Sequence, residues 1–422
     1  MKFKKFSKKQ LKVLSWWAVP EIADKYNAVI ADGSVRSGKT MSMSVSFVIW
    51  IMESFSDCNF AICGKTVGSC RRNVIKPLVN MLSSRYEIKE KRSENLIYIN
   101  KNGKSNTIYI FGGKDESSQD LIQGITLAGV LFDEVALMPR SFVEQALARC
   151  SVSGARFWFN CNPENPNHWF YQEWIKKAEQ KKALRLKFLM DDNLTLSDEI
   201  KKRYYSLYTG TFFKRFVLGE WVVAEGLVYQ KYNDNIDKKL WYGNAEELQG
   251  AWYLSVDYGT INPCSIGLWC VTQKQAIRVK EYYWDSRREG IQRTDEEHYA
   301  ELDKLAENHD IQYVVVDPSA ASFITTINRH NKYFVLKAKN DVLNGIRVTS
   351  QMLDSGLVLI SKNCNNAIEE FGIYRWDINN KSEQDTVVKE NDHAMDDIRY
   401  FCYTVLANEF YYEEWANEIQ RI

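Results

Sequence analysis

The sequence predicts an α/β protein with two domains, each built around its own β-sheet. Three observations lead to this fold class. A glycine-rich octapeptide at 33–40 lies between a strand-like run and an apolar helix. Apolar runs farther along the first half end abruptly in polar residues, as parallel strands that are buried on both faces do. The second half reads as three strands, a helix and a fourth strand, and 422 residues suffice for two separate cores.

The octapeptide fits the pattern G-x-x-x-x-G-K-[ST] of a phosphate-binding P-loop at every constrained position. Its two glycines would let the backbone curl so that N–H groups face a β-phosphate. Lys39 would reach the β- and γ-phosphates, and the Thr40 hydroxyl would ligate Mg²⁺. A glycine- and serine-rich turn before a helix is the alternative. The predicted ATP-binding residues are Gly33, Ser34, Val35, Arg36, Ser37, Gly38, Lys39 and Thr40.

Gln10 lies upstream of the P-loop in a basic and polar segment. A glutamine at this place is a candidate reader of the adenine base of ATP. A glutamine on the protein surface is the alternative, and the sequence alone favours the surface position.

The next informative stretch is the apolar run 129–132, which Asp133 and Glu134 follow directly. An acid at the carboxyl end of a buried parallel strand lies beside the P-loop, so this run is a candidate Walker B strand. Asp133 would hold Mg²⁺, partly through water, and Glu134 would orient and deprotonate the attacking water. An ordinary strand end with two surface acids is the alternative.

Formal charge is divided unequally along the chain, although the net charge is only +1. Residues 1–240 hold 37 Lys and Arg against 25 Asp and Glu, whereas residues 241–422 hold 18 against 29. A basic half suits a polyanion such as nucleic acid, and an acidic half suits a metal site built from carboxylates. Nine scattered cysteines indicate reduced thiols, and no apolar run approaches the roughly eighteen residues of a membrane span, so we expect a soluble intracellular protein.

A third apolar strand, 155–159, ends in Asn160-Cys161-Asn162-Pro163 and is followed by Trp169. A P-loop, an Asp-Glu strand end and then Asn-x-Asn-Pro is an order that resembles the large subunit of tailed-bacteriophage terminases. The resemblance extends over most of the chain. It implies that Asn160 and Asn162 belong to the coupling motif that senses the γ-phosphate. A polar turn stopped by prolines is the alternative.

The segment 214–229, with Leu-Gly-Glu-Trp and Glu-Gly-x-Val-Tyr, looks like the linker segment of the same family. A polar and turn-rich stretch follows it at 233–239. We therefore expect a P-loop ATPase domain with a mostly parallel sheet at 1–225, a linker at 226–248 and a second domain at 249–422.

In the second domain, Asp257 and Asp317 end the first and fourth predicted strands. The order β-β-β-α-β with these acids resembles the ribonuclease H and resolvase fold, whose last helix brings a third acid. Asp396 and its neighbour Asp397 both lie on such a helix, and helical geometry alone leaves the choice open. Resemblance to the terminase nuclease selects Asp257, Asp317 and Asp396 as metal ligands, with His393 pointing into the site. Three such carboxylates can hold two Mg²⁺ or Mn²⁺ ions for phosphodiester cleavage.

The resemblance implies a packaging motor that uses ATP to drive double-stranded viral DNA into a procapsid, joined to a nuclease that cuts the DNA concatemer. The implied partners are viral DNA, the portal protein, a small terminase subunit and further copies of the chain in a ring on the portal. The implied compartment is the cytoplasm of the host cell, without membrane contact.

One position departs from the family pattern. Gln123 stands where many terminases have a basic residue, so an arginine finger cannot be assigned there. Arg36 in cis, or Arg140 and Arg149 in trans, are the alternatives. A repair or recombination ATPase with a fused resolvase-type nuclease is the rival function, and a DNA clamp with ATP as a structural ligand is a third.

Overall fold

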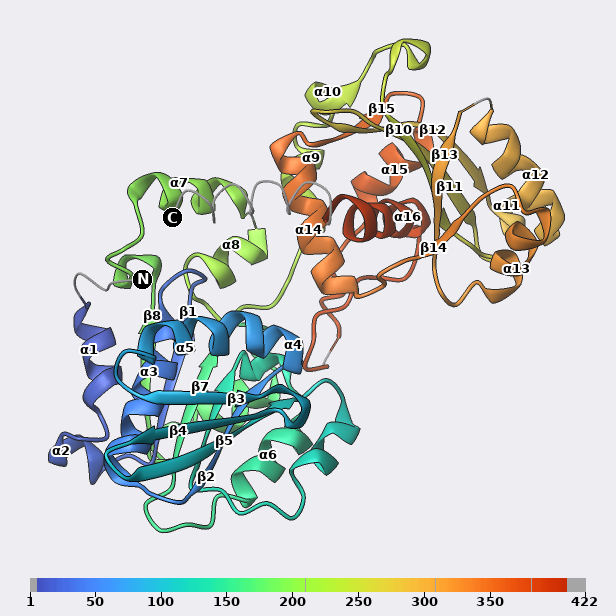
Figure 1. Ribbon diagram of the computed structural model, residues 1–422. Helices are drawn as coiled ribbons and strands as arrows, with labels where there is room; N and C mark the ends of the chain where they lie inside the picture. The colour runs from blue at the N-terminus through green and yellow to red at the C-terminus, as the bar shows by residue number, and fades with distance from the viewer. Residues whose placement is uncertain (1–5, 209, 308, 381, 408–422) are drawn as a thin grey trace. The chain divides into compact units, whose positions relative to one another are not determined.

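The computed structural model describes residues 6–208, 210–307, 309–380 and 382–407, and the chain divides into two compact units (Figure 1). The first unit comprises Met1–Val223 with Lys381–Gln384, and the second comprises Ala224–Asn380 with Asp385–Ile422. Each unit contains one large β-sheet.

The sheet of the first unit has eight strands in the order β3-β4-β5-β2-β6-β7-β1-β8. Strands β5, β2, β6, β7, β1 and β8 are parallel, whereas β3 and β4 form an antiparallel edge. The strands are β1 (Ala28–Gly33), β2 (Asn59–Gly64), β3 (Glu87–Lys91), β4 (Leu96–Lys101), β5 (Lys104–Gly112), β6 (Gly129–Asp133), β7 (Arg156–Cys161) and β8 (Ala183–Phe188).

Helices cover both faces of this sheet, so its central strands are buried throughout. Every residue of β1 and β6 is buried. Val29 and Ala31 face a core that includes α3 and α5, while Ala28 and Ile30 face a second core that includes α6. The helices are α1 (Lys8–Ser15), α2 (Pro20–Ala23), α3 (Lys39–Ser54), α4 (Val67–Cys70), α5 (Lys76–Leu82), α6 (Arg140–Ala148), α7 (Asp198–Leu207) and α8 (Gly210–Phe216).

The sheet of the second unit has seven strands in the order β14-β13-β10-β11-β12-β15-β9. Strands β10, β11 and β12 are antiparallel neighbours, and β13 returns parallel to β10. This is the predicted β-β-β-α-β order, and it confirms the ribonuclease H-like α/β fold class. The strands are β9 (Leu240–Trp241), β10 (Ala251–Asp257), β11 (Cys264–Val271), β12 (Ala276–Trp284), β13 (Ile311–Val316), β14 (Val335–Lys337) and β15 (Val358–Ser361).

Two groups of helices pack on opposite faces of the second sheet. Trp252, Leu254 and Val256 share a core with α12 and α13. On the other face, the Phe401 ring of α16 lies 5.6 Å from the Tyr253 ring and 4.3 Å from the Trp269 ring. The helices are α9 (Gln230–Asn233), α10 (Ile236–Lys239), α11 (Ser286–Glu289), α12 (Asp295–Ala306), α13 (Ala321–His330), α14 (Val342–Ser355), α15 (Asn365–Ile373) and α16 (His393–Phe401).

The segment that the sequence assigns to a linker, 226–248, is structured as part of the second unit. It contains α9, α10 and β9, and β9 pairs in parallel with β15. The Tyr229 ring lies 5.6 Å from the Phe371 ring, and the Tyr232 ring lies 4.7 Å from it. Aromatic burial therefore fixes this segment to α15.

All nine cysteines are free thiols, and most are buried. Within the described ranges, no helix combines the length and the apolar character that crossing a membrane requires.

Candidate functional site

The P-loop connects the carboxyl end of β1 to the first turn of α3, as the sequence predicts. Gly33 has φ of 139°, and a Cβ there would overlap the backbone oxygen of Phe188 on β8. Gly38 has φ of 82°, and a Cβ there would lie 2.6 Å from Nε2 of Gln10. Both positions combine a positive φ with a close neighbour, so only glycine fits them.

Lys39 is buried and points back into the loop. Its Nζ donates to the backbone oxygens of Gly33 and Ser34, at 3.1 and 2.5 Å, and to Oδ1 of Asn162 at 3.1 Å. Burial lowers the pKa of Lys39 to about 8. A phosphate in the loop would offset this desolvation, since it would supply a full negative charge beside the ammonium.

The predicted Mg²⁺ ligands contact each other at the neighbouring strand ends. Thr40 Oγ1 donates to Asp133 Oδ1 at 3.1 Å, and Asn160 Nδ2 donates to both atoms at 2.8 and 2.5 Å. Burial, and then the charge of Glu134, raise the pKa of Asp133 to about 6. These hard oxygen donors suit Mg²⁺. Asn160, which the resemblance assigns to the coupling motif, is therefore in direct contact with the residues expected to hold the metal.

Glu134 occupies an unusual backbone conformation at the tip of β6. Its φ of 61° and ψ of 48° lie in the left-handed region, which costs a non-glycine residue about 1–3 kcal/mol. Its charge acts on both Lys39 and Asp133. Strain of this kind gathers at functional sites, and here it occurs at the residue predicted to be the catalytic glutamate.

Gln10 lies against the P-loop and is only 2% exposed, so the surface alternative is wrong. Its Oε1 accepts from the backbone N–H of Ser7 at 3.0 Å, which completes the capping box of α1. The cap holds the amide at the start of the helix, and the packing of that end of α1 against Gly38 of the P-loop buries it. Recognition of adenine by Gln10 stays a prediction.

Two other buried polar side chains of the first unit, Asp32 next to the P-loop and His168, were not expected from the sequence. Asp32, fully buried, accepts from Arg185 through Nε at 3.1 Å and Nη2 at 2.8 Å, and from Trp221 Nε1 at 3.1 Å. His168 accepts from the Phe170 N–H at Nδ1, and burial lowers its pKa to about 4. The sequence offered one indication that Asp32 is structurally important, namely an acid within the otherwise apolar strand 28–33. No sequence pattern indicated that His168 is buried.

Two of the three arginines considered as arginine fingers have side-chain partners within the first unit, whereas Nε of Arg149 is buried without a hydrogen-bond partner among the described residues. Arg36 Nε donates to the Tyr204 hydroxyl at 2.7 Å, and Arg140 Nε donates to Glu144 at 2.6 Å. Gln123 donates to Asp120 at 2.9 Å. Arg36 is the member of this set that belongs to the P-loop itself.

The second unit contains a pocket of about 520 Å³ at the carboxyl end of β10. Asp257 comes from β10, and His393 and Asp396 come from the first turn of α16. His393 Nδ1 lies 2.8 Å from Asp257 Oδ2. Burial raises the pKa of Asp257 to about 6. The lining residues are Asp257, Tyr258, Gly259, Asn262, Pro263, Asp285, Arg287, Lys389, Glu390, Asn391, Asp392, His393 and Asp396.

Asp317 lies beside this pocket but does not line it. Val256 and Val316 are register partners on the parallel strands β10 and β13, so Asp257 and Asp317 leave neighbouring strands at the same level. Tyr400 of α16 makes a hydrogen bond to Asp317 and also experiences the charges of Asp257 and Asp396. Tyr400 therefore lies near all three predicted carboxylates.

Within the part of the chain that the structure describes, no three Asp, Glu, His or Cys side chains are grouped tightly enough to hold a metal ion as they stand. Basic side chains of the protein itself contact two of the three predicted carboxylates. His393 pairs with Asp257, while Arg399 Nη2 and Lys389 Nζ lie 2.9 and 3.2 Å from Asp396. The donor chemistry itself fits Mg²⁺ or Mn²⁺, because carboxylate oxygens from two strand ends and a helix face one region.

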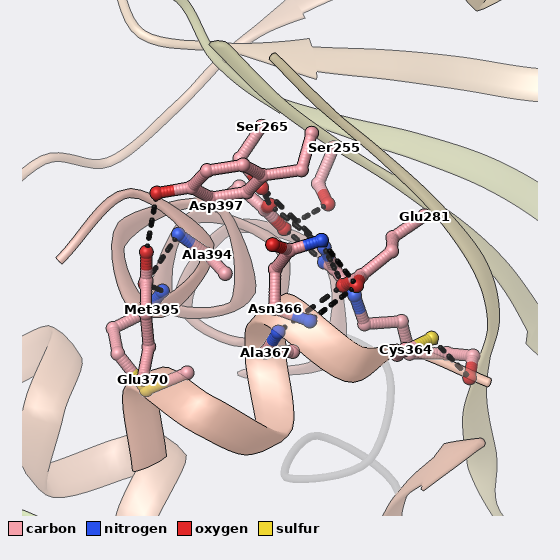
Figure 2. A network of polar contacts seen from close by, with 12 residues as sticks. Ser255, Ser265, Glu281, Cys364, Asn366, Ala367, Glu370, Ala394, Met395 and Asp397 are labelled. Carbon is pink, nitrogen blue, oxygen red and sulfur yellow. Dashed lines mark hydrogen bonds and ion pairs between the residues drawn. The ribbon is translucent and has the colours of Figure 1, made fainter. Parts of the chain in front are cut away.

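Asp397 lies in the core, within a network of polar contacts (Figure 2). It does not line the pocket. It is fully buried and accepts from Arg278 Nη2 at 3.0 Å, Ser255 Oγ at 2.8 Å, and Ser265 Oγ. Asp396, the adjacent residue, lines the pocket. Because Ser255 precedes Asp257 by two residues on β10, the Asp397 network ties α16 to the strand that carries Asp257.

A second buried carboxylate holds the amino end of α16 (Figure 2). Glu370 of α15 accepts from the backbone N–H groups of Ala394 and Met395 at 2.7 and 3.1 Å, and from the Tyr283 hydroxyl at 2.8 Å. Burial raises the pKa of Glu370 to about 7. No sequence pattern marked Glu370, because its partners come from a helix and a strand far along the chain.

Comparisons with known proteins agree with this geometry. The family model "Terminase large subunit, T4likevirus-type, N-terminal" matches residues 30–233. The terminase large subunit of Escherichia phage T5 is 21% identical over 202 residues, and the match spans 46% of this chain and 45%, or about half, of the T5 protein.

Solved structures extend the likeness to the second unit. The large terminase of a thermophilic bacteriophage, in complex with ADP, is 48% identical, with a TM-score of 0.87 over 95% of this chain and 100% of that chain. A second crystal form of the same thermophilic phage protein gives 48% identity and a TM-score of 0.90 over 96% of this chain and 100% of that chain. The chain therefore belongs to the phage terminase large subunit family.

Proposed function

We propose that this terminase hydrolyses ATP at the P-loop to move double-stranded viral DNA into a procapsid, and that it cuts concatemeric DNA in the pocket beside β10. One observation carries the motor assignment: Lys39, Thr40, Asp133, Asn160 and Asn162 converge at the carboxyl ends of β1, β6 and β7. The large terminase of the thermophilic phage supports it, because its structures hold ADP and ATP-γ-S.

In the motor, Lys39 would leave the backbone oxygens of the loop and contact the β- and γ-phosphates. Thr40 and Asp133 would hold the Mg²⁺ that accompanies ATP, and Glu134 would take a proton from the attacking water. Asn162, now bound to Lys39, would lose this partner when the phosphates arrive. That exchange would carry the nucleotide state into the coupling segment.

Asp257 and Asp396 in the pocket, together with Asp317 beside it, would hold two Mg²⁺ or Mn²⁺ ions. Such a pair of ions supplies an activated water and stabilises the leaving oxygen of a phosphodiester. His393 orients the Asp257 carboxylate through the contact to Oδ2. Tyr400 orients Asp317 in the same way.

The partners follow from the proposed task. The basic first half would hold backbone phosphates of DNA without reading sequence, so a small terminase subunit would choose the site. The chain would form a ring on the portal protein, in the cytoplasm of the infected cell. Arg36 would act as the arginine finger in the ATP site of its own chain. Arg140 or Arg149 would act instead in the ATP site of a neighbouring copy.

A packaging assay separates this function from a repair ATPase with a fused nuclease. Purified chain, portal-bearing procapsids, linear duplex DNA and ATP are mixed, and DNA protected from DNase is measured. We expect ATP-dependent protection that the Lys39→Ala variant lacks. Equal DNA-stimulated ATPase with and without procapsids, and no protected DNA, would favour the repair ATPase.

A fragment comprising residues 224–422 is expected to fold alone and to nick plasmid DNA in Mn²⁺ without ATP. It retains β9 and the aromatic contacts of Tyr229 and Tyr232, whereas a fragment that starts at 245 loses them. We expect the longer fragment to melt at a higher temperature than the shorter one. Thermal unfolding and gel assays of plasmid nicking measure both properties.

The matched control for nicking is the same fragment with Asp396→Asn. Nicking that persists in this control with a changed metal dependence comes from a contaminating nuclease, whereas nicking with the metal dependence of the unaltered fragment would show that Asp396 is not a metal ligand. Folded 224–422 fragment that leaves plasmid intact at every Mg²⁺ and Mn²⁺ concentration would count against the nuclease assignment.

A further inference from the structure

Lys389 places an ammonium group inside the acidic pocket of the second unit. Its Nζ lies 3.1 Å from Asp392 Oδ2 and 3.2 Å from Asp396 Oδ2. The other cation that lines the pocket, Arg287, donates to the Asn262 side chain at 2.9 Å. Lys389 is therefore the lining cation that pairs with the pocket carboxylates.

The two oxygens of Asp396 have different partners. Oδ1 accepts from Arg399 through Nε at 3.2 Å and Nη2 at 2.9 Å, and the Arg399 side chain is only 2% exposed. Oδ2 contacts Lys389, whose side chain is 60% exposed. Arg399 is fixed in the core, where Nη1 also donates to the Asn340 backbone oxygen. Of these two cations, Lys389 is the one that can leave Asp396 without disturbing the packing of α16.

The backbone keeps Lys389 close to its partners. Val387 forms a β-bridge with Trp376, and the Val388 N–H donates to the Arg375 backbone oxygen at 3.1 Å, so the chain is anchored just before Lys389. Asn391 has φ of 53°, a left-handed turn that asparagine tolerates, and α16 begins two residues later. A cation on so short a tether competes at a high effective concentration.

We propose that Lys389 is a built-in counter-ion that competes with the divalent metal for Oδ2 of Asp396, and so sets the metal affinity of the pocket. The inference rests on the proposed nuclease function, because it takes Asp396 as a metal ligand. A divalent ion on Oδ2 and an ammonium on the same atom repel each other, so one excludes the other. Metal loading then requires Lys389 to swing towards solvent.

The test is calorimetric titration of the full chain with MnCl₂, after removal of metals and without nucleotide or DNA. Subtracting the titration of the Asp396→Asn variant isolates the heat of Mn²⁺ binding that depends on Asp396. If Lys389 contacts Asp396 in more than about nine-tenths of the metal-free molecules, the Lys389→Met variant should bind Mn²⁺ at least about tenfold more tightly than the wild type. Arg287→Met is the matched control, since it removes one positive charge from the same pocket. Because Arg287 contacts Asn262 and does not compete for Asp396, the Mn²⁺ affinity of this variant should differ from that of the wild type by less than about twofold.

Thermal unfolding gives a second readout that does not depend on cleavage. Without metal, Lys389→Met should melt below the wild type, because Asp392 and Asp396 lose their shared counter-ion. Added Mn²⁺ should then raise the melting temperature of Lys389→Met by more than it raises that of the wild type. The reason is that a ligand that binds the folded state more tightly stabilises it more.

The outcomes separate the inference from the function beneath it. If the wild type binds Mn²⁺ through Asp396 and Lys389→Met binds no tighter, the counter-ion role is overturned and the nuclease site stands. Equal tightening by Lys389→Met and Arg287→Met would also overturn it, because general charge would then explain the effect. If neither the wild type nor Lys389→Met shows Mn²⁺ binding that depends on Asp396, the proposed nuclease site itself fails.

Discussion

Glu134→Gln is expected to slow ATP turnover by at least about a hundredfold, the scale typical for losing a general base, while ATP affinity stays near that of the wild type. Glutamine keeps the size of the side chain but cannot accept a proton from the attacking water. The groups expected to bind ATP, Lys39 and Thr40, are unchanged. Steady-state phosphate release gives the turnover, and titration with a fluorescent ATP analogue gives the affinity.

Glu94→Gln is the matched control for this variant. Glu94 is an exposed acid that pairs with Lys91 at the antiparallel edge of the same sheet, which is the edge remote from β1. Its replacement should leave turnover unchanged. Wild-type turnover in Glu134→Gln would show that another group activates the water, and the strained backbone at Glu134 would need a different explanation.

The sequence was sufficient to predict the parts of the nucleotide site that lie at strand ends. The P-loop, Asp133 and the Asn160 segment each follow a buried apolar run, and parallel strands bring such ends to one edge. The contacts of Asp32 could not be predicted, because Arg185 and Trp221 lie 153 and 189 residues away along the chain. The position of Gln10 depends likewise on how α1 packs against the P-loop.

In the second unit, the strand order could be predicted, but the role of the segment 226–248 could not. Strand β9 has only two residues, and its partner β15 lies more than a hundred residues later, so no local pattern marks it. The two neighbouring acids on α16 show the same limit. Helical spacing left Asp396 and Asp397 open, and the buried Arg278 of β12 is what separates their environments.

This separation gives the last prediction. Asp396→Asn should abolish DNA cleavage and leave ATP turnover intact, because Asp396 lines the pocket and its loss removes a charge that the metal needs. Plasmid nicking across a Mn²⁺ titration measures the first effect, and phosphate release measures the second. Unfolding in urea should show that the variant keeps its fold, because asparagine retains an oxygen that can accept from Arg399, and Arg399 also keeps its bond to the Asn340 backbone oxygen.

Asp397→Asn should instead lower the folding stability and retain DNA cleavage. Arg278 and Asp397 are both fully buried, and removing one partner of such a pair costs about 3 kcal/mol of folding stability. Glu281, 3.5 Å from Arg278, would compensate in part, so the variant should still fold at low temperature and retain measurable cleavage. Its urea midpoint should fall well below that of Asp396→Asn. The assignment would be reversed if Asp396→Asn cleaved DNA with the Mn²⁺ dependence of the wild type and a stably folded Asp397→Asn no longer cleaved DNA.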